Sequence, residues 1–302
     1  MNTKSGYVAI LGLPNAGKST LMNALLGQKL SITTSKPQTT RKQILGILSS
    51  ENYQAIFLDT PGIIKPGYLL QEKMMEAVSR SIKNADIIVL IVDVSSDPEG
   101  KQTLNNIFIA EKVSNTEKPF LLLLNKIDLT QQENVKNLIS KLESFNKFNK
   151  IIPISALLNF NIEEVLNSIV ELLPEGPKYY PDDIVADENE RFFVSEIVRE
   201  KVFELYKEEI PYGTEVIIVD FKEREDKKDY ILAEVIVERE SQKGILIGKK
   251  GAALKKLGLD ARKSIEEFLQ KEVYLELRVK VKNKWRSDEK QLRSFGYIKP
   301  EE

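Results

Sequence analysis

Apolar residues follow two different patterns along the first 173 residues of the chain. Five short runs are apolar on both faces, as strands covered by helices on either side must be; they lie at 7–13, 54–59, 86–94, 119–126 and 150–156. Amphipathic segments of helical period lie between most of them, for example at 135–145. This alternation predicts a doubly wound α/β domain with a mostly parallel sheet.

The pattern changes at 174–187, where three prolines and a glycine interrupt any helix. Beyond this stretch we expect the order α-β-β-α-α-β, which describes a small α+β domain. Its elements are a helix at 195–210, strands at 214–223 and 230–240 joined by a turn at 226–229, a short helix, a glycine loop, a long helix and a strand at 273–281. The chain therefore divides into an α/β domain at 1–175, a linker at 176–187 and an α+β domain at 188–302.

Composition excludes several classes of chemistry. The 302 residues include no cysteine and no histidine, so disulfides, zinc clusters and Cys or His catalysis are ruled out. The longest apolar runs, at 87–92 and 120–124, fall far short of the ~20 residues that span a bilayer. The N-terminus does not resemble a secretory signal. We expect a cytoplasmic protein that acts as a monomer.

Charge is distributed unevenly along the chain. Residues 241–302 hold 16 Lys and Arg against 9 Asp and Glu, whereas residues 1–240 hold 28 against 36. A basic end on an otherwise acidic protein indicates a polyanionic partner at that end.

The stretch "GLPNAGKST" at 12–20 predicts a phosphate-binding loop. Gly12, Gly17, Lys18 and Ser19 fit the pattern G-x-x-x-x-G-K-[ST] between an apolar strand and a helix. The backbone N–H groups and the helix N-terminus would cradle phosphate, Lys18 would bridge the β- and γ-phosphates, and Ser19 would hold Mg²⁺. We assign Asn15, Ala16 and Thr20 to the same nucleotide site. The alternative is an ordinary strand-to-helix turn.

Three later segments complete a nucleotide site. "FLDTPG" places Asp59 where it can reach Mg²⁺ and Gly62 where its N–H can reach the γ-phosphate, although such a sequence is also a plausible turn.

"NKID" places Asp128 to accept hydrogen bonds from N1–H and the 2-amino group of guanine, donors that adenine lacks. Asn125 would tie this segment to the phosphate loop, and Lys126 would cover the base. "SAL", which comprises Ser155, Ala156 and Leu157, would offer a backbone N–H to guanine O6.

These four segments in this order resemble those of Ras-like GTPases of the translation-factor class, and more closely those of the bacterial Era family. The resemblance implies a Mg²⁺-binding switch threonine in "KPQTTR"; we choose Thr40, with Thr39 as the alternative. Lys18, Thr40 and Gly62 would then act on the γ-phosphate. Ile63 stands where Ras-like proteins carry a water-orienting Gln, so slow intrinsic hydrolysis is expected. Asn15 stands where potassium-dependent relatives carry an Asn, which suggests K⁺ as a further cofactor.

A second glycine-rich stretch, "ILIGKKGAALKKLG" at 245–258, contains a loop at 248–251 that lies between two predicted helices. The four residues Gly248, Lys249, Lys250 and Gly251 match the G-x-x-G of a KH domain, which clamps about four nucleotides of single-stranded RNA. Ile245, Ile247 and the following helix would form one wall of a groove for bases. A solvated helix–helix turn is the alternative.

The tail at 280–297 adds charge close to this loop. Lys282, Lys284 and Arg286 would contact phosphates. Trp285 would stack on a base or, as an equal alternative, pack in the interior. The resemblance to Era extends over nearly the whole chain, because that family carries a KH domain at its C-terminus.

The combined interpretation is a GTP-hydrolysing switch joined to an RNA-binding KH domain. By resemblance, its partners would be GTP and GDP, single-stranded ribosomal RNA near the 3′ end of 16S rRNA, and the small ribosomal subunit, whose assembly it would assist. Asp128 argues against an ATPase. Two alternatives remain: a non-catalytic RNA chaperone with a structural nucleotide site, which Ile63 favours, and a GTPase regulator associated peripherally with the inner face of the cell membrane.

Overall fold

The computed structural model describes residues 3–113, 116–144, 147–225 and 227–298. Within it the chain forms two compact units. The first unit comprises Met1–Pro66 and Met74–Asp187, and the second comprises Gly67–Lys73 and Glu188–Glu302. The predicted helix at 135–145 and the predicted turn at 226–229 each include one residue, 145 or 226, that lies outside the described residues.

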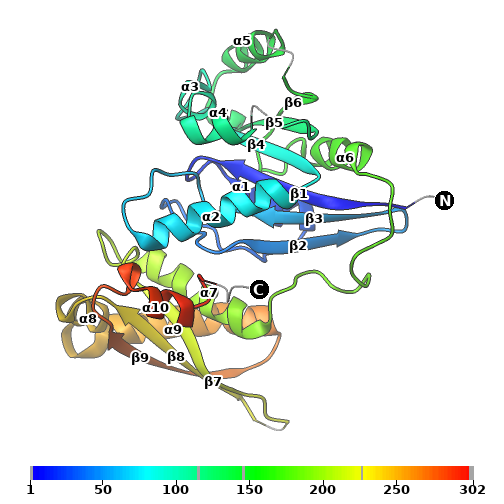
Figure 1. The fold of residues 1–302 in the computed structure, drawn as a ribbon. Helices are drawn as coiled ribbons and strands as arrows, with labels where there is room; N and C mark the ends of the chain where they lie inside the picture. The colour runs from blue at the N-terminus through cyan, green and yellow to red at the C-terminus, as the bar shows by residue number, and fades with distance from the viewer. Residues whose placement is uncertain (1–2, 114–115, 145–146, 226, 299–302) are drawn as a thin grey trace. The chain divides into compact units, whose positions relative to one another are not determined.

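A six-stranded sheet in the order β2-β3-β1-β4-β5-β6 organises the first unit (Figure 1). β2 is antiparallel to β3, and the other neighbouring strands are parallel. The strands are β1 (Lys4–Gly12), β2 (Ile44–Ser49), β3 (Tyr53–Asp59), β4 (Ile87–Asp93), β5 (Phe120–Asn125) and β6 (Lys150–Pro153). β2 was not predicted from the sequence, because Gly46 divides a short and only partly buried apolar run.

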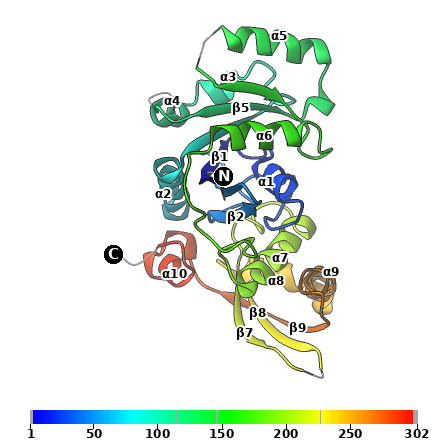
Figure 2. The same ribbon diagram turned by 90° about the vertical axis from the view of Figure 1, so that its right-hand side faces the viewer.

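Helices cover both faces of this sheet, which confirms the doubly wound fold (Figure 2). α1 (Lys18–Leu26) and α6 (Ile162–Leu172) contact each other on one face. The other face carries α3 (Lys101–Leu104), α4 (Ile107–Val113), α5 (Gln132–Glu143) and α2 (Leu69–Asn84), of which the part from Met74 onward belongs to this unit. Here side chains such as Val78, Ile109 and Leu138 pack against Leu90 and Leu122 of the central strands. A short 3₁₀ helix, η1 (Ile127–Leu129), follows β5.

The second unit has the predicted order α-β-β-α-α-β. Its sheet runs β7-β8-β9, with β7 and β8 antiparallel and β8 and β9 parallel. The elements are α7 (Glu190–Leu205), β7 (Glu215–Lys222), β8 (Asp229–Val237), α8 (Glu240–Ile247), η2 (Lys249–Gly251), α9 (Ala252–Leu269), β9 (Val273–Val281), η3 (Trp285–Ser287) and α10 (Glu289–Ser294). α7 begins five residues before the predicted start because the side chain of Asn189 caps it, accepting from the Phe192 N–H at 3.0 Å.

The segment 174–187 is anchored to the first unit. The buried Gln54 of β3 accepts at Oε1 from the N–H groups of Tyr179 and Tyr180, at 2.8 and 3.0 Å, and its Nε2 donates to Tyr180 O at 2.8 Å. The Ile47 N–H of edge strand β2 donates to Val185 O at 2.9 Å. This stretch therefore covers part of an exposed sheet edge, which is a common way to protect such an edge.

Candidate functional site

A pocket of about 510 Å³ opens in the first unit where the carboxyl ends of the parallel strands meet. Binding sites of open α/β sheets characteristically lie at this edge. All the nucleotide-site residues predicted from the sequence line the pocket except Gly12, Ala16 and Asp59. Further lining residues that the sequence analysis did not single out are Pro14, Ile32, Thr33, Thr34, Ser35, Gln38 and Leu129.

The phosphate loop forms one end of this pocket. Gly17 has a φ of 100°, and a Cβ there would lie 2.2 Å from Asn125 Nδ2, so this position requires glycine. Lys18 donates from Nζ to the carbonyl oxygens of Gly12 and Leu13, at 3.3 and 2.9 Å. Burial lowers the pKa of Lys18 to about 8, and the negative charge of Asp59 opposes that shift. A phosphate group placed here would stabilise the charged lysine further.

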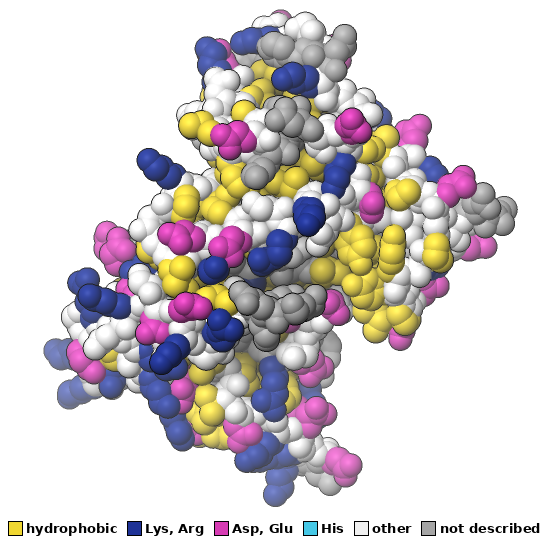
Figure 3. Space-filling model, in the orientation of Figure 1, with side chains coloured by type: hydrophobic (Ala, Val, Ile, Leu, Met, Phe, Trp, Pro, Cys, Tyr) yellow, Lys and Arg dark blue, Asp and Glu magenta, His cyan; other side chains and the backbone are white. Residues whose placement is uncertain are grey.

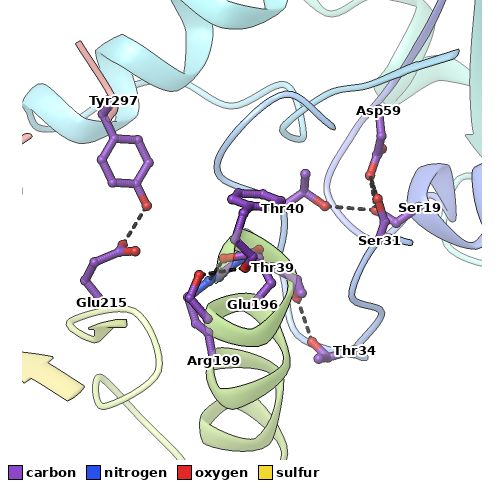
Figure 4. A network of polar contacts seen from close by, with 12 residues as sticks. Ser19, Ser31, Thr34, Thr39, Thr40, Asp59, Glu196, Arg199, Glu215 and Tyr297 are labelled. Carbon is purple, nitrogen blue, oxygen red and sulfur yellow. Dashed lines mark hydrogen bonds and ion pairs between the residues drawn. The ribbon is translucent and has the colours of Figure 1, made fainter. Parts of the chain in front are cut away.

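Next to the loop, three hydroxyl groups and one carboxylate form a cluster (Figure 4). Ser19 Oγ lies 2.8 Å from Thr40 Oγ1 and donates to Asp59 Oδ2 at 2.7 Å. Ser31 Oγ donates to the same carboxylate oxygen at 2.9 Å. Burial raises the pKa of Asp59, and the hydrogen bonds and the charge of Lys18 partly offset this effect. Ser31 was not predicted from the sequence.

This cluster fits Mg²⁺. Asp59 is fully buried, yet its Oδ1 accepts no hydrogen bond from the described residues. A buried oxygen in that condition is available to contact a metal ion or a water bound to it. In the described part of the chain, no cluster of three or more acidic side chains is placed to hold a metal. One carboxylate with hydroxyl oxygens nevertheless suits Mg²⁺, which is usually held by one or two carboxylates together with substrate phosphates.

The geometry separates the two candidate switch threonines. Thr40 contacts Ser19 within the cluster. Thr39 Oγ1 lies 2.6 Å from Thr34 Oγ1 and donates to Lys36 O at 2.8 Å, so its hydroxyl is engaged within its own loop. The arrangement favours Thr40.

Gly62 and Ile63, which follow Asp59 in the chain, lie in different environments: Gly62 lies against the phosphate loop and Ile63 lies in the core. A Cβ on Gly62 would lie 2.8 Å from Pro14 Cα, so a side chain there would push the phosphate loop aside. The Ile63 side chain is buried in the core of the unit, packed among residues such as Leu11 and Leu90, while its N–H donates to Gly12 O at 3.0 Å. Position 63 therefore directs its side chain into the core and cannot orient water in the pocket.

At the other end of the pocket, Asn125 joins three segments. Its Nδ2 donates to Ala16 O at 2.7 Å, which is the predicted tie to the phosphate loop, and its Oδ1 accepts from the Ala156 N–H at 3.0 Å. Lys126 Nζ lies 2.6 Å from Asp93 Oδ2, a partner that was not predicted. Asp128 is exposed and lines the pocket, as Ser155 and Leu157 also do.

The second glycine loop joins α8 to α9. Lys250 and Gly251 have positive φ angles of 51° and 78°, which allow the tight reversal between the helices. Lys249 and Lys250 are exposed. Further Lys and Arg side chains, interspersed with Asp and Glu, lie on the face of this unit that Figure 3 shows. This loop can therefore present its charges to a phosphate backbone.

A groove of about 380 Å³ begins at this loop and is built from α9 and β9. It is lined by Gly251, Leu254, Lys255, Gly258, Leu259, Arg262, Leu275 and Leu277. Ile245 and Ile247, which belong to α8, do not line it, and this differs from the wall predicted from the sequence. An apolar floor with basic residues at its edge suits nucleic-acid bases flanked by phosphates.

The tail residues are largely engaged in the structure of the second unit. Trp285 is fully buried, donates from Nε1 to Gly213 O at 2.9 Å and packs edge-on against Phe295. This favours the packing alternative over base stacking. Arg286 donates twice to Glu238, at 3.0 and 2.5 Å, and Lys282 Nζ lies 4.8 Å from the Phe295 ring centroid. Lys284 is exposed.

Comparison with known proteins identifies the families to which the two domains are similar. A family model described as "50S ribosome-binding GTPase" matches residues 7–126, and a KH-domain model matches residues 209–286. GTPase Era of Clostridium botulinum is 44% identical over 294 residues, which cover 97% of this chain and 98% of that protein. The chain belongs to the Era family of GTPases. It is therefore a GTPase with a C-terminal KH domain.

Other members of the family give the same result. Chloroplastic GTPase ERA1 of Zea mays is 46% identical over 98% of this chain and 71% of its own length. A solved structure of Era in complex with MgGDPNP and nucleotides 1506–1542 of 16S ribosomal RNA superposes with a TM-score of 0.90. It is 40% identical, and the match covers 98% of this chain and all of that one. The Era-type fold predicted from the sequence is thus confirmed.

Proposed function

We propose that this GTPase binds single-stranded ribosomal RNA near the 3′ end of 16S rRNA through its KH domain and assists assembly of the small ribosomal subunit. The observation that carries the proposal is the exposed Lys249–Lys250 loop at the mouth of the α9–β9 groove. The relative solved with 16S nucleotides supports the choice of RNA. In this proposal residues 1–175 form the GTPase domain, 176–187 the linker and 188–302 the RNA-binding domain.

On GTP, each part of the pocket has a proposed role. Lys18 neutralises charge that develops between the β- and γ-phosphates, and the Gly62 N–H donates to the γ-phosphate. Ser19, Thr40 and Asp59 would hold Mg²⁺, which would supply positive charge that stabilises the phosphate groups. Asp128 accepts from guanine N1–H and the 2-amino group, while Lys126 and Leu157 flank the base. Because Ile63 lies in the core, we expect slow hydrolysis by the isolated protein.

The RNA proposal is tested by reversing charge in the glycine loop. Lys249→Asp combined with Lys250→Asp should weaken binding of an oligonucleotide with the 16S 3′-terminal sequence by at least about 10-fold and flatten its salt dependence. Lys227→Asp combined with Lys228→Asp is a matched control, because it changes a second exposed lysine pair of the same unit. Equal affinities for the two double variants, measured by fluorescence anisotropy, would refute this site.

The ribosomal subunit requires its own test, because the matched GTPase model is described by its binding to the 50S subunit. The relative solved with 16S RNA matches far more of the chain, so we favour the small subunit. When this protein is pulled down from cells and the RNA bound to it is sequenced, 16S RNA should be enriched over 23S RNA. Enrichment of 23S RNA would favour the large subunit instead.

A potassium ion is the second proposed cofactor. Asn15, in the phosphate loop, donates from Nδ2 to Ser35 O at 2.9 Å, so a side-chain amide and a backbone carbonyl lie together at the phosphate end of the pocket. Oxygen ligands of this kind suit K⁺, which could supply positive charge beside the phosphates. Hydrolysis should rise when K⁺ replaces Na⁺ in the presence of Mg²⁺. Equal rates in the two salts would remove K⁺ from the proposal.

Compartment, association and oligomeric state are further proposals. No helix in the described residues has the length and apolar character needed to cross a bilayer. We propose a cytoplasmic monomer that associates weakly with the inner face of the membrane through its basic end, although relatives include chloroplastic proteins. Cell fractionation and light scattering of the purified protein test these points.

A further inference from the structure

Two hydroxyl groups converge on one oxygen of Asp59. Neither belongs to the segment "FLDTPG" from which Asp59 was predicted. Ser19 and Ser31 both donate to Oδ2, at 2.7 and 2.9 Å (Figure 4). Ser31 and Asp59 are fully buried, so the hydrogen bond between them does not compete with bulk water. The second carboxylate oxygen, Oδ1, receives no hydrogen bond from the described residues.

A clamp from α1 holds Ser31 in place. Asn23 Oδ1 accepts from the N–H groups of Leu30 and Ser31, at 3.0 and 2.9 Å, and its Nδ2 donates to Ser31 O at 2.8 Å. Asn23 follows Ser19 by four residues, so both side chains project from the same side of one helix. Helix α1 thus supplies one donor to Asp59 directly and fixes the backbone that carries the other.

We propose that Ser31, held by Asn23, is a positioning residue that orients Asp59 toward the Mg²⁺ site, an inference that rests on the proposed function. Without Ser31, Ser19 would be the one remaining side-chain donor among the described residues, and the carboxylate would be held less firmly about its terminal torsion. With donors from α1 and from the loop both on Oδ2, its plane is fixed and Oδ1 keeps its lone pairs for the metal or its bound water. Groups that hydrogen-bond to a metal-binding carboxylate typically change metal affinity or activity by 10- to 100-fold when removed.

The clamp also defines where the switch segment begins. Ser31 is bound through its N–H, its C=O and its side chain, and Thr40 lies nine residues later. A rearrangement of the segment that carries Thr40 can therefore leave Ser31 and Asp59 in place. Asp59 would remain oriented in either nucleotide state.

The proposal is tested by the dissociation rate of the fluorescent nucleotide mant-GDP across a Mg²⁺ titration that begins in EDTA. In Ser31→Ala, the Mg²⁺ concentration giving half-maximal slowing should rise about 10- to 100-fold. The rate in EDTA should stay that of the wild-type protein, because Ser31 does not line the nucleotide pocket. Ser31→Thr keeps a hydroxyl and should restore most of the Mg²⁺ response.

Ser81→Ala is the matched control, because Ser81 is equally buried and donates to Ala77 O at 2.9 Å within α2. Circular dichroism checks folding, and Ser31→Cys, which nearly preserves volume, replaces Ser31→Ala if that variant does not fold. An unchanged Mg²⁺ midpoint in the Ser31 variant, an equal shift in Ser81→Ala, or faster dissociation in EDTA would each overturn the proposal. A wild-type protein that releases mant-GDP independently of Mg²⁺ would overturn the proposed metal site itself, and this inference with it.

Discussion

Lys126 Nζ lies 2.6 Å from Asp93 Oδ2, which connects the residue after β5 to the last residue of β4. Ser95 donates to the other oxygen of Asp93 from its backbone N–H, at 3.0 Å. Partial burial opposes ionisation of Asp93, but hydrogen bonds from Lys126 and Ser95 outweigh burial and lower the pKa of the carboxyl. Asp93 is thus a charged anchor for the lysine that we place beside guanine.

Asp93→Ala should weaken GDP binding about fivefold, because a partly exposed ion pair contributes roughly 1 kcal/mol. The released Lys126 side chain would no longer be held beside the base. Stopped-flow measurement of mant-GDP binding gives the affinity, and Lys126→Met completes a double-mutant cycle. Additive losses from the two substitutions would show that Asp93 acts by a route other than Lys126.

Thr40→Ala should lower GTP hydrolysis about 100-fold at saturating GTP and Mg²⁺, since its hydroxyl belongs to the cluster around Ser19 and Asp59. Thr39→Ala removes a neighbouring hydroxyl that bonds within its own loop, so a much smaller loss is expected. Single-turnover phosphate release compares the two variants. A larger loss for Thr39→Ala would make Thr39 the switch residue.

Local motifs made the nucleotide site predictable. The phosphate loop, "NKID" and "SAL" each concentrate their chemistry in a few consecutive residues, and parallel strands deliver these segments to one edge of the sheet. Ser31 and Asp93 could not be found in this way. Their partners, Asp59 and Lys126, lie 28 and 33 residues away, and a lone Ser or Asp has no spacing signal of its own.

In the second unit, chain order was easier to predict than which surfaces face solvent. The α-β-β-α-α-β order followed from hydrophobic periodicity, and the glycine loop followed from its position between helices. Ile245 was expected at the groove because it is apolar and adjacent to the loop, but α9 and β9 supply the lining. Trp285 is a comparable case, because an indole pairs equally well with a base or with Phe295, and tertiary packing decides.

Leu259→Ala should weaken binding of single-stranded RNA about fivefold, because Leu259 is half-exposed and lines the α9–β9 groove, where its apolar surface can be covered by a base. Ile245→Ala is the control, since Ile245 is similarly exposed and outside the groove. Anisotropy titrations on both folded variants give the comparison. A greater loss of RNA affinity with Ile245→Ala would favour the groove wall that was predicted from the sequence, which includes Ile245.

Gln54→Ala should release the segment 174–187 from the first unit. The substitution removes three hydrogen bonds to the backbone of Tyr179 and Tyr180, and net contributions of about 0.5 to 1.5 kcal/mol each suggest roughly 2 kcal/mol or more for local opening. If opening precedes cleavage in a fast equilibrium, trypsin should cut at Lys178 about 30-fold faster.

Gln132→Ala, at an exposed position of α5, controls for removal of a glutamine without release of the segment. Unchanged cleavage at Lys178 in Gln54→Ala would mean that the antiparallel contact of Ile47 with Val185 and the ring contact of Tyr7 with Tyr179 hold the segment without Gln54. Faster cleavage would instead make the buried amide of Gln54 the principal anchor of the segment 174–187.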